Sequence, residues 1–260
     1  MPMIDSHMVL AILGVAVIGG IIGLDRTAAG QFMISQPIVA APFTGWVLGD
    51  MTAGMVIGAT LELIWVLDIP VGTFVPANAT VCAVSATAIA ALGNPGGGAP
   101  LPDIGFSVLL TAAMVPVTRK ADGLIRAWNS RLSDRVLAAT ARDRGRELVR
   151  AQFAGLTFFF LKSFVLCGIF VLVGIGALWI FGQFPGAVRR ALSLFVKLLP
   201  LLGVAIVVRK LSIKALDQYF FAGFAAAALF GQAVHAPALV VLLLTSAAGW
   251  LGARYRERHA

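Results

Sequence analysis

Acidic side chains stand inside or beside apolar stretches of this chain, where they can act on a polar ligand. The segment 47–72 reads VLGDMTAGMVIGATLELIWVLDIPVG and carries Asp50, Glu62 and Asp68, and Asn78 follows it. An ionisable side chain in a membrane segment costs about 2.5–3.5 kcal/mol on insertion scales, so it faces a cavity, a partner or lipid headgroups. These residues are therefore the first candidates for a functional site.

Glu62 lies at the centre of its apolar segment rather than at an end. Small, apolar or weakly polar residues precede it from Ala53 onward, and residues 63–67 are all apolar. A carboxylate in such a place must be neutralised, paired or hydrogen-bonded. One that accepts hydrogen bonds from two hydroxyls would hold a sugar. Two alternatives stay open: a carboxylate that couples protons or cations, and a buried glutamate held by backbone amides at a broken helix.

The segment 73–81, TFVPANATV, interrupts another apolar run with Pro76 and Asn78. Proline breaks the run because it lacks a backbone N–H. The amide of Asn78 has donors and an acceptor, which suits a polyol ligand. Asn78 is therefore a second candidate for a site that binds hydroxyl groups.

The remaining acids near the apolar stretches have simpler interpretations. Asp50 follows Gly49 at the end of a short apolar piece, where its carboxylate either caps the next helix or belongs to the site. Asp68 precedes an Ile-Pro pair, which predicts a turn. Asp25 and Arg26 follow the first apolar run, and we interpret them as charges at a span end that lie among lipid headgroups.

The composition indicates an integral membrane protein. Of the 260 residues, 59% are hydrophobic and only 12% are charged, with a mean hydropathy of +0.93. A soluble domain has about a quarter of its residues charged. The net charge of +8 does not indicate a nucleic-acid partner, because nine of the 20 Lys and Arg residues fall within 119–150. Cys82, Cys167 and three scattered histidines show no metal or disulfide spacing, so we expect no metal, no cofactor and no catalytic residues.

Apolar stretches recur along the whole chain, at 8–24, 37–49, 53–67, 69–93, 104–118, 154–182, 191–208, 219–231 and 234–252. A straight span needs about 20 residues, and several of these stretches are shorter. Short apolar pieces interrupted by Gly or Pro are typical of re-entrant hairpins and broken transporter helices. The sequence therefore predicts an all-α integral membrane protein, a multi-span helical bundle with short re-entrant or broken helices.

Charge divides the chain into three parts. We expect an N-terminal membrane part, 1–118, that contains the re-entrant hairpins and the candidate site, and a C-terminal membrane part, 153–260, with a basic tail. Between them, 119–152 is predicted to be a basic amphipathic helix or loop. The positive-inside rule predicts that 119–150 and the C-terminus are cytoplasmic. Contact with lipid headgroups and docking of a cytoplasmic partner are both open for the basic part.

The stretch QPIVAAPFTGWVLGDMTAGMVIGATLELIWV, together with VGTFVPANATVCA, resembles the IIC membrane component of the mannose/fructose/sorbose family of the bacterial phosphotransferase system. The similar motifs are the Gln36-Pro37 start, the Gly-Asp turn at 45–50, the hairpin at 58–62 and the break at 72–79. Two further stretches are similar to the family's central and C-terminal segments: LTAAMVPVTRKADGLIRAWNSRLSDR and LPLLGVAIVVRKLSIKALDQYFFAGFAAAALF.

The resemblance implies a bacterial inner-membrane protein that binds a hexose and passes it inward. In the family, IIC works with a second membrane component, IID, and cytoplasmic IIA and IIB components carry the phosphate that IIB transfers to the sugar. IIC itself holds no phosphorylated residue. Carried over by motif, the sugar contacts would be Glu62, Asn78 and Gln31. From the residues themselves, we expect Gly49, Asp50, Asp68 and Pro76 to shape the hairpin ends. The resemblance also implies a homo- or hetero-oligomer.

The sequence departs from the family pattern at a few positions. Ala77-Asn78 stands where Pro-Asp is usual, Gln36 stands where Arg is common, and LDRTAAG adds length before Gln31. These departures keep two other functions open. One is a regulatory or sensory membrane protein derived from a IIC, and the other is an ion-coupled secondary transporter that uses Glu62 as a proton site.

Overall fold

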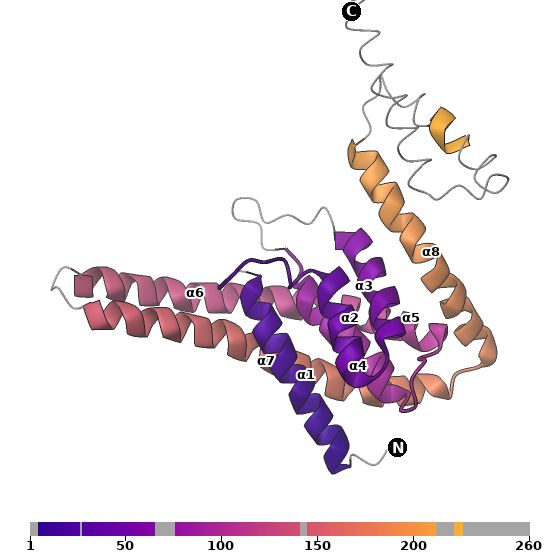
Figure 1. Ribbon diagram of the computed structural model, residues 1–260, viewed down its shortest axis with the longest axis horizontal. Helices are drawn as coiled ribbons and strands as arrows, with labels where there is room; N and C mark the ends of the chain where they lie inside the picture. Colours follow the sequence, from indigo (N-terminus) through magenta and orange to yellow (C-terminus); the bar gives the residue numbers. More distant parts are fainter. Residues whose placement is uncertain (1–4, 27, 66–75, 141–144, 212–220, 226–260) are drawn as a thin grey trace, which may run out of the picture. The chain divides into compact units, whose positions relative to one another are not determined.

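The computed structural model describes residues 5–26, 28–65, 76–140, 145–211 and 221–225. Within these ranges the chain forms α-helices joined by short turns, with no strand (Figure 1). The helices are α1 (Ser6–Asp25), α2 (Pro37–Leu48), α3 (Met51–Trp65), α4 (Ala79–Gly93), α5 (Leu101–Ala113), α6 (Val115–Thr140), α7 (Gly145–Gly182) and α8 (Gly186–Leu211). The predicted all-α fold class is confirmed.

Two of the described helices are long and apolar enough to cross a membrane. They are α1, Ser6–Asp25, and the part of α7 at Leu148–Gly182. A third span is formed if α5 and the first part of α6, which meet at a 42° bend, count as one broken helix. In contrast, α2, α3 and α4 have only 12, 15 and 15 residues, too few for a straight span. The prediction of short or broken helices within a membrane bundle is confirmed.

The turn between α2 and α3 is built by Gly49 and Asp50. Gly49 has φ +83°, a left-handed conformation that glycine adopts without steric cost. The Gly49 N–H donates to the Trp46 carbonyl (3.2 Å) and the Asp50 N–H to the Gly45 carbonyl (2.8 Å), which is the Schellman pattern of a helix end. The Asp50 carboxylate then accepts from the Ala53 N–H (3.0 Å) and so caps α3.

The same carboxylate joins this hairpin to the loop between α4 and α5. Its second oxygen accepts from the Ala99 N–H at 2.7 Å. The two helices of the hairpin also pack closely through glycines: a Cβ on Gly54 would lie 2.5 Å from the Ala41 carbonyl oxygen, and one on Gly58 would lie 2.6 Å from the Pro37 carbonyl oxygen. Without those glycines the α2 and α3 backbones could not approach each other.

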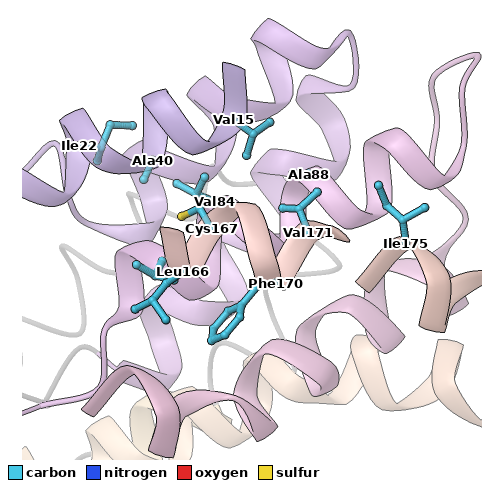
Figure 2. Packing of buried hydrophobic residues seen from close by; sticks show 11 residues of the cluster. Val15, Ile22, Ala40, Val84, Ala88, Leu166, Cys167, Phe170, Val171 and Ile175 are labelled. Carbon is cyan, nitrogen blue, oxygen red and sulfur yellow. The ribbon is translucent and has the colours of Figure 1, made fainter. Parts of the chain in front are cut away.

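Helix α4 is the centre of the bundle. Twelve of its 15 residues are buried, and most of them are Ala, Ser, Thr, Val or Cys, whose small side chains let α1, α2, α3, α5 and α7 pack around it. Figure 2 shows side chains of α1, α4 and α7 pointing toward one another, with Val84 and Ala88 near Cys167 and Val171. Cys82 and Cys167 are both free and buried.

The basic stretch 119–150 is helical over most of its length. Its described residues lie on α6 and the start of α7, which run side by side (Figure 1). Trp128 and Phe158 meet edge to face, with ring centroids 5.8 Å apart. Because α6 begins at Val115, the expected boundary between residues 118 and 119 falls inside a helix.

The chain divides into two compact units, residues 1–205 and 206–260. The first contains α1–α7 and most of α8, and it holds every described candidate residue discussed below. Of the second unit the structure describes residues 206–211 and 221–225. The apolar segment predicted at 234–252 and the basic tail lie outside the described residues.

Candidate functional site

The end of α1 organises the turn that leads to α2. The Asp25 carboxylate, in a residue only 8% exposed, accepts from the backbone N–H groups of Phe32 (2.6 Å) and Ser35 (3.0 Å). Both Asp25 and Arg26 bind protein groups, which the interpretation of them as charges among lipid headgroups did not predict. The reason is the turn itself, which folds its N–H groups back onto the end of α1.

Gln31 lies in this turn in an unusual backbone conformation. Its φ is +55°, next to Gly30 at +82°, and Met33 has φ +64°. For residues other than glycine, a left-handed conformation costs about 1–2 kcal/mol and persists only where the surroundings impose it. Here Asp25 supplies that constraint. The Gln31 side chain is exposed.

Asn78 caps α4 and is held by Arg26. Its side-chain oxygen accepts from the Val81 N–H (3.2 Å) and from Nη1 of Arg26 (3.4 Å). Nη2 of Arg26 also donates to the Ala77 carbonyl at 2.5 Å. Asn78 is 1% exposed. An amide oxygen has two lone pairs, so both acceptor positions of Asn78 are occupied and the Nδ2 group is its remaining hydrogen-bonding function.

Glu62 lies near the end of α3 and contacts the start of α2. Its Oε2 accepts from the Ile38 N–H at 3.2 Å, and the residue is half-buried. Ile38 is in the first turn of α2, where backbone N–H groups lack helical partners and the helix dipole favours a negative charge. The alternative of a glutamate satisfied by a backbone amide thus accounts for one carboxylate oxygen. Among the described residues, no hydrogen-bond donor contacts the other one.

One short stretch, Phe32 to Ile38, gathers these groups. Asp25 of α1 binds its N–H groups, Thr80 of α4 donates to its Ser35 carbonyl (2.7 Å), and Glu62 of α3 accepts from its last N–H. Three helices therefore converge on this stretch, which directly follows Gln31 and leads into α2. Within the described residues no direct hydrogen bond joins any two of the three predicted sugar contacts.

Three predicted hairpin residues are placed, and one is not. Asp50 and Gly49 belong to the opposite end of α3 from Glu62, roughly 18 Å away along the helix. Pro76 begins the described segment that leads to Asn78. Asp68 lies outside the described residues.

A buried ion pair was not predicted from the sequence. Lys162 of α7 binds the Asp122 carboxylate of α6, and the two side chains are only 6% and 9% exposed. The Lys162 ammonium also lies over the Phe159 ring, 5.4 Å from its centroid. Lys162 stands inside the apolar helix Leu148–Gly182, and a charge there requires a partner. The sequence shows that Lys162 needs a partner, but it does not show that this partner is Asp122.

The structure also contains a cavity of about 410 Å³ along α6 and α7. None of the predicted sugar contacts lines it. Its lining residues are Ala28, Asn129, Leu132, Ser133, Leu148, Ala151, Gln152, Gly155, Leu156 and Phe159. Over the described residues, no three His, Cys, Asp or Glu side chains come together as metal ligands.

The fold and the buried polar groups define a polytopic helical membrane protein with polar residues inside its bundle, which is the architecture of membrane permeases. The chain belongs to the family described as PTS system sorbose-specific IIC component, whose family model matches residues 8–247. PTS stands for the phosphotransferase system. The resemblance to IIC sugar permease components inferred from the sequence is therefore confirmed.

Individual relatives agree with the family. The chain is 24% identical over 225 residues to the fructose permease IIC component of Bacillus subtilis (strain 168), covering 86% of this chain and 80% of the relative. It is 25% identical over 203 residues to the PTS system mannose-specific EIIC component of Escherichia coli (strain K12), covering 76% and 73%.

Solved structures share the fold. One described as a membrane protein superposes with a TM-score of 0.66 at 21% identity, covering 92% of this chain and 96% of that chain. A chain from the cryo-EM structure of the mannose transporter ManYZ with microcin E492 gives a TM-score of 0.55 at 20% identity, covering 97% and 96%. At these identities the likeness shows the fold alone.

Proposed function

We propose that this chain binds a hexose between α3, α4 and the turn before α2, and passes it inward for phosphorylation by a cytoplasmic IIB component. The observation that carries the proposal is the arrangement of Glu62 and Asn78. Both come from helices that bind the short stretch Phe32 to Ile38: α3 through Glu62 at Ile38, and α4 through Thr80 at Ser35. Each keeps one polar group without a described partner: a carboxylate oxygen and an amide Nδ2.

These two groups complement a sugar. Neighbouring hydroxyls of a hexose both donate and accept hydrogen bonds, so one can donate to the Glu62 carboxylate while another accepts from Asn78 Nδ2. Arg26 and the α4 cap fix the Asn78 side chain before the sugar arrives, which lowers the entropy cost of binding. Gln31, exposed in the constrained turn, adds a third group that can both donate and accept.

Charge indicates which side of the protein is cytoplasmic. Nine of the 20 Lys and Arg residues fall in 119–150, and seven of them lie on α6 and the start of α7. The positive-inside rule assigns such a segment to the cytoplasm. We infer that this side of a bacterial inner membrane is where the sugar emerges. Phosphate transfer belongs to the IIA and IIB components, and the IID component completes the membrane complex.

The test is phosphoenolpyruvate-dependent accumulation of labelled hexoses in membrane vesicles that contain this chain, its IID partner and the soluble components. Glu62→Gln keeps an acceptor for the Ile38 N–H but removes the charge that a sugar would meet. Asp5→Asn, the same chemical change at an exposed helix cap, is the matched control. Accumulation of sugar phosphate by the wild type and the control, but not by Glu62→Gln, supports the proposal.

Two other outcomes would contradict it. No accumulation of any hexose tried, with the phosphate donors shown to be active, would favour the regulatory or sensory function. Uptake that collapses with a protonophore but persists without phosphoenolpyruvate would favour an ion-coupled transporter.

A further inference from the structure

Two residues on the same face of α6, one helical turn apart, bind other parts of the protein. Thr118 Oγ1 accepts from the Asn78 backbone N–H at 3.4 Å and donates to the Val115 carbonyl at 2.8 Å. Asp122, one helical turn later, binds Lys162 of α7. Thr118 is fully buried and Asp122 is 6% exposed, so both contacts lie inside the protein.

The contact to α7 fixes α6 more strongly than apolar packing alone would. Two charges with side chains 6% and 9% exposed cannot separate without leaving each other unpaired in a poorly solvating interior. The pair therefore permits one register of α6 on α7. That register sets where Thr118 lies, and Thr118 contacts the backbone of Asn78.

Asn78 is thus held on three sides. Arg26, directly after α1, donates to its side-chain oxygen, and the Val81 N–H of α4 donates to the same oxygen. Thr118 Oγ1 of α6 accepts from its backbone N–H. The first two contacts orient the side chain, whereas the third fixes the position of the main chain. A shift of α6 would move the Nδ2 group relative to Glu62, whose position depends on α2 and α3.

We propose that Asp122 and Lys162 are positioning residues for the sugar site: their ion pair sets the register of α6, which holds Asn78 through Thr118. This proposal rests on the proposed function for the role of Asn78 in sugar binding. It predicts that the ion pair controls the affinity for the hexose although neither residue touches it.

The experiment replaces both charges by apolar side chains of similar size. Replacing a buried ion pair in this way is often neutral for stability, whereas removing one partner alone is not. The variant is therefore Asp122→Leu with Lys162→Met. The control is Asp103→Leu with Arg189→Met, which removes a more exposed pair (3.2 Å; side chains 10% and 36% exposed) that joins α5 and α8 without a contact to Asn78.

Two quantities are measured on the complex with the IID partner, using labelled mannose and fructose as probes. The first is the Kd of the sugar. We expect it to rise about five- to tenfold in Asp122→Leu/Lys162→Met, the equivalent of one hydrogen bond, with unchanged insertion and an unchanged Kd in the control. The second is hydrogen exchange of the Asn78 amide, which should become faster in the same variant and stay slow in the control.

Thr118→Val tests whether the ion pair acts on Asn78 through Thr118. It removes the acceptor of the Asn78 N–H, so it should raise the Kd and the amide exchange rate by itself. Combined with Asp122→Leu/Lys162→Met it should add little, because both changes act on the same contact. Independent, multiplying effects would overturn the proposal.

The proposal is also overturned if Asp122→Leu/Lys162→Met leaves both the Kd and the exchange of the Asn78 amide at wild-type values. If the wild type binds neither sugar, the proposed function fails. Hydrogen exchange alone then tests whether the ion pair fixes the position of Asn78. Faster exchange of the Asn78 amide in the variant supports this role, and unchanged exchange contradicts it.

Discussion

Replacing Asp50 by alanine should destabilise the protein strongly, because one buried carboxylate satisfies two backbone groups. Asp50 is 4% exposed and accepts from the N–H groups of Ala53 (3.0 Å) and Ala99 (2.7 Å). A hydrogen bond to a charged group contributes about 1.5–3 kcal/mol, so losing two predicts at least about 3 kcal/mol. For a chain of this size, that corresponds to a fall in Tm of about 6–12 °C.

The assay is thermal unfolding of the purified protein in detergent, followed by loss of the monodisperse peak in size-exclusion chromatography. Asp50→Asn should lose about half as much stability, because Asn caps a helix well but offers one acceptor oxygen instead of two. Asp5→Ala, at the exposed cap of α1, is the control and should lose no more than about 1 kcal/mol. If Asp50→Ala unfolds within about 2 °C of the control, the double role of this carboxylate is refuted.

Other substitutions test the packing and the polar groups. Gly54→Ala should reduce the Tm and the inserted yield, because its Cβ would meet the backbone of α2, whereas Gly14→Ala, with no atom within 4 Å, should stabilise α1 slightly. Asn78→Ala should lose about 1 kcal/mol of stability with its cap, whereas Asn78→Asp should keep that stability but change the order of preference among hexoses in a competition assay, because a donor becomes an acceptor. Lys162→Met alone should cost about 3–5 kcal/mol by leaving Asp122 unpaired, and Asp122→Leu in the same chain should restore the Tm.

The parts of the fold that depend on local chemistry were predictable. The Gly49-Asp50 pair marks the end of α2 and the start of α3 because left-handed glycine and a capping carboxylate act within a few residues. The apolar runs predicted the long helices because burial in lipid requires them. The resemblance to the family could be recognised for the same reason, because its motifs are the short interruptions of the apolar runs, such as the Gly-Asp turn at 45–50.

The contacts between distant segments were not predictable. Asp25 and Arg26 read as the polar end of a span, because nothing in the sequence shows that the following turn folds its N–H groups back onto Asp25. Lys162 signalled a buried charge, but its partner Asp122 lies 40 residues away, in a stretch that was predicted to be a basic cytoplasmic amphipathic helix or loop. The composition of a stretch describes all faces of a helix together. An ion pair depends on a single residue on one face, so the composition could not indicate that Asp122 is buried.

The same distinction applies to the candidate site. Glu62 and Asn78 were notable because polar side chains are rare in apolar segments. The sequence did not show that Ile38 would bind one carboxylate oxygen of Glu62, or that Arg26 would occupy the oxygen of Asn78. These contacts decide which atoms are left for a ligand, and they depend on how four helices meet.

The most direct test of the sugar site is equilibrium binding of labelled mannose, fructose and sorbose to the purified complex, with the wild type and Glu62→Gln measured side by side. The account predicts that the wild type binds at least one of them and that Glu62→Gln weakens this binding at least about tenfold, the loss of a charge-assisted hydrogen bond. Its Tm should fall by no more than about 4 °C, the loss of one favourable contact with the dipole of α2. Equal affinity of the two proteins for the sugar would contradict the account and remove Glu62 from the site.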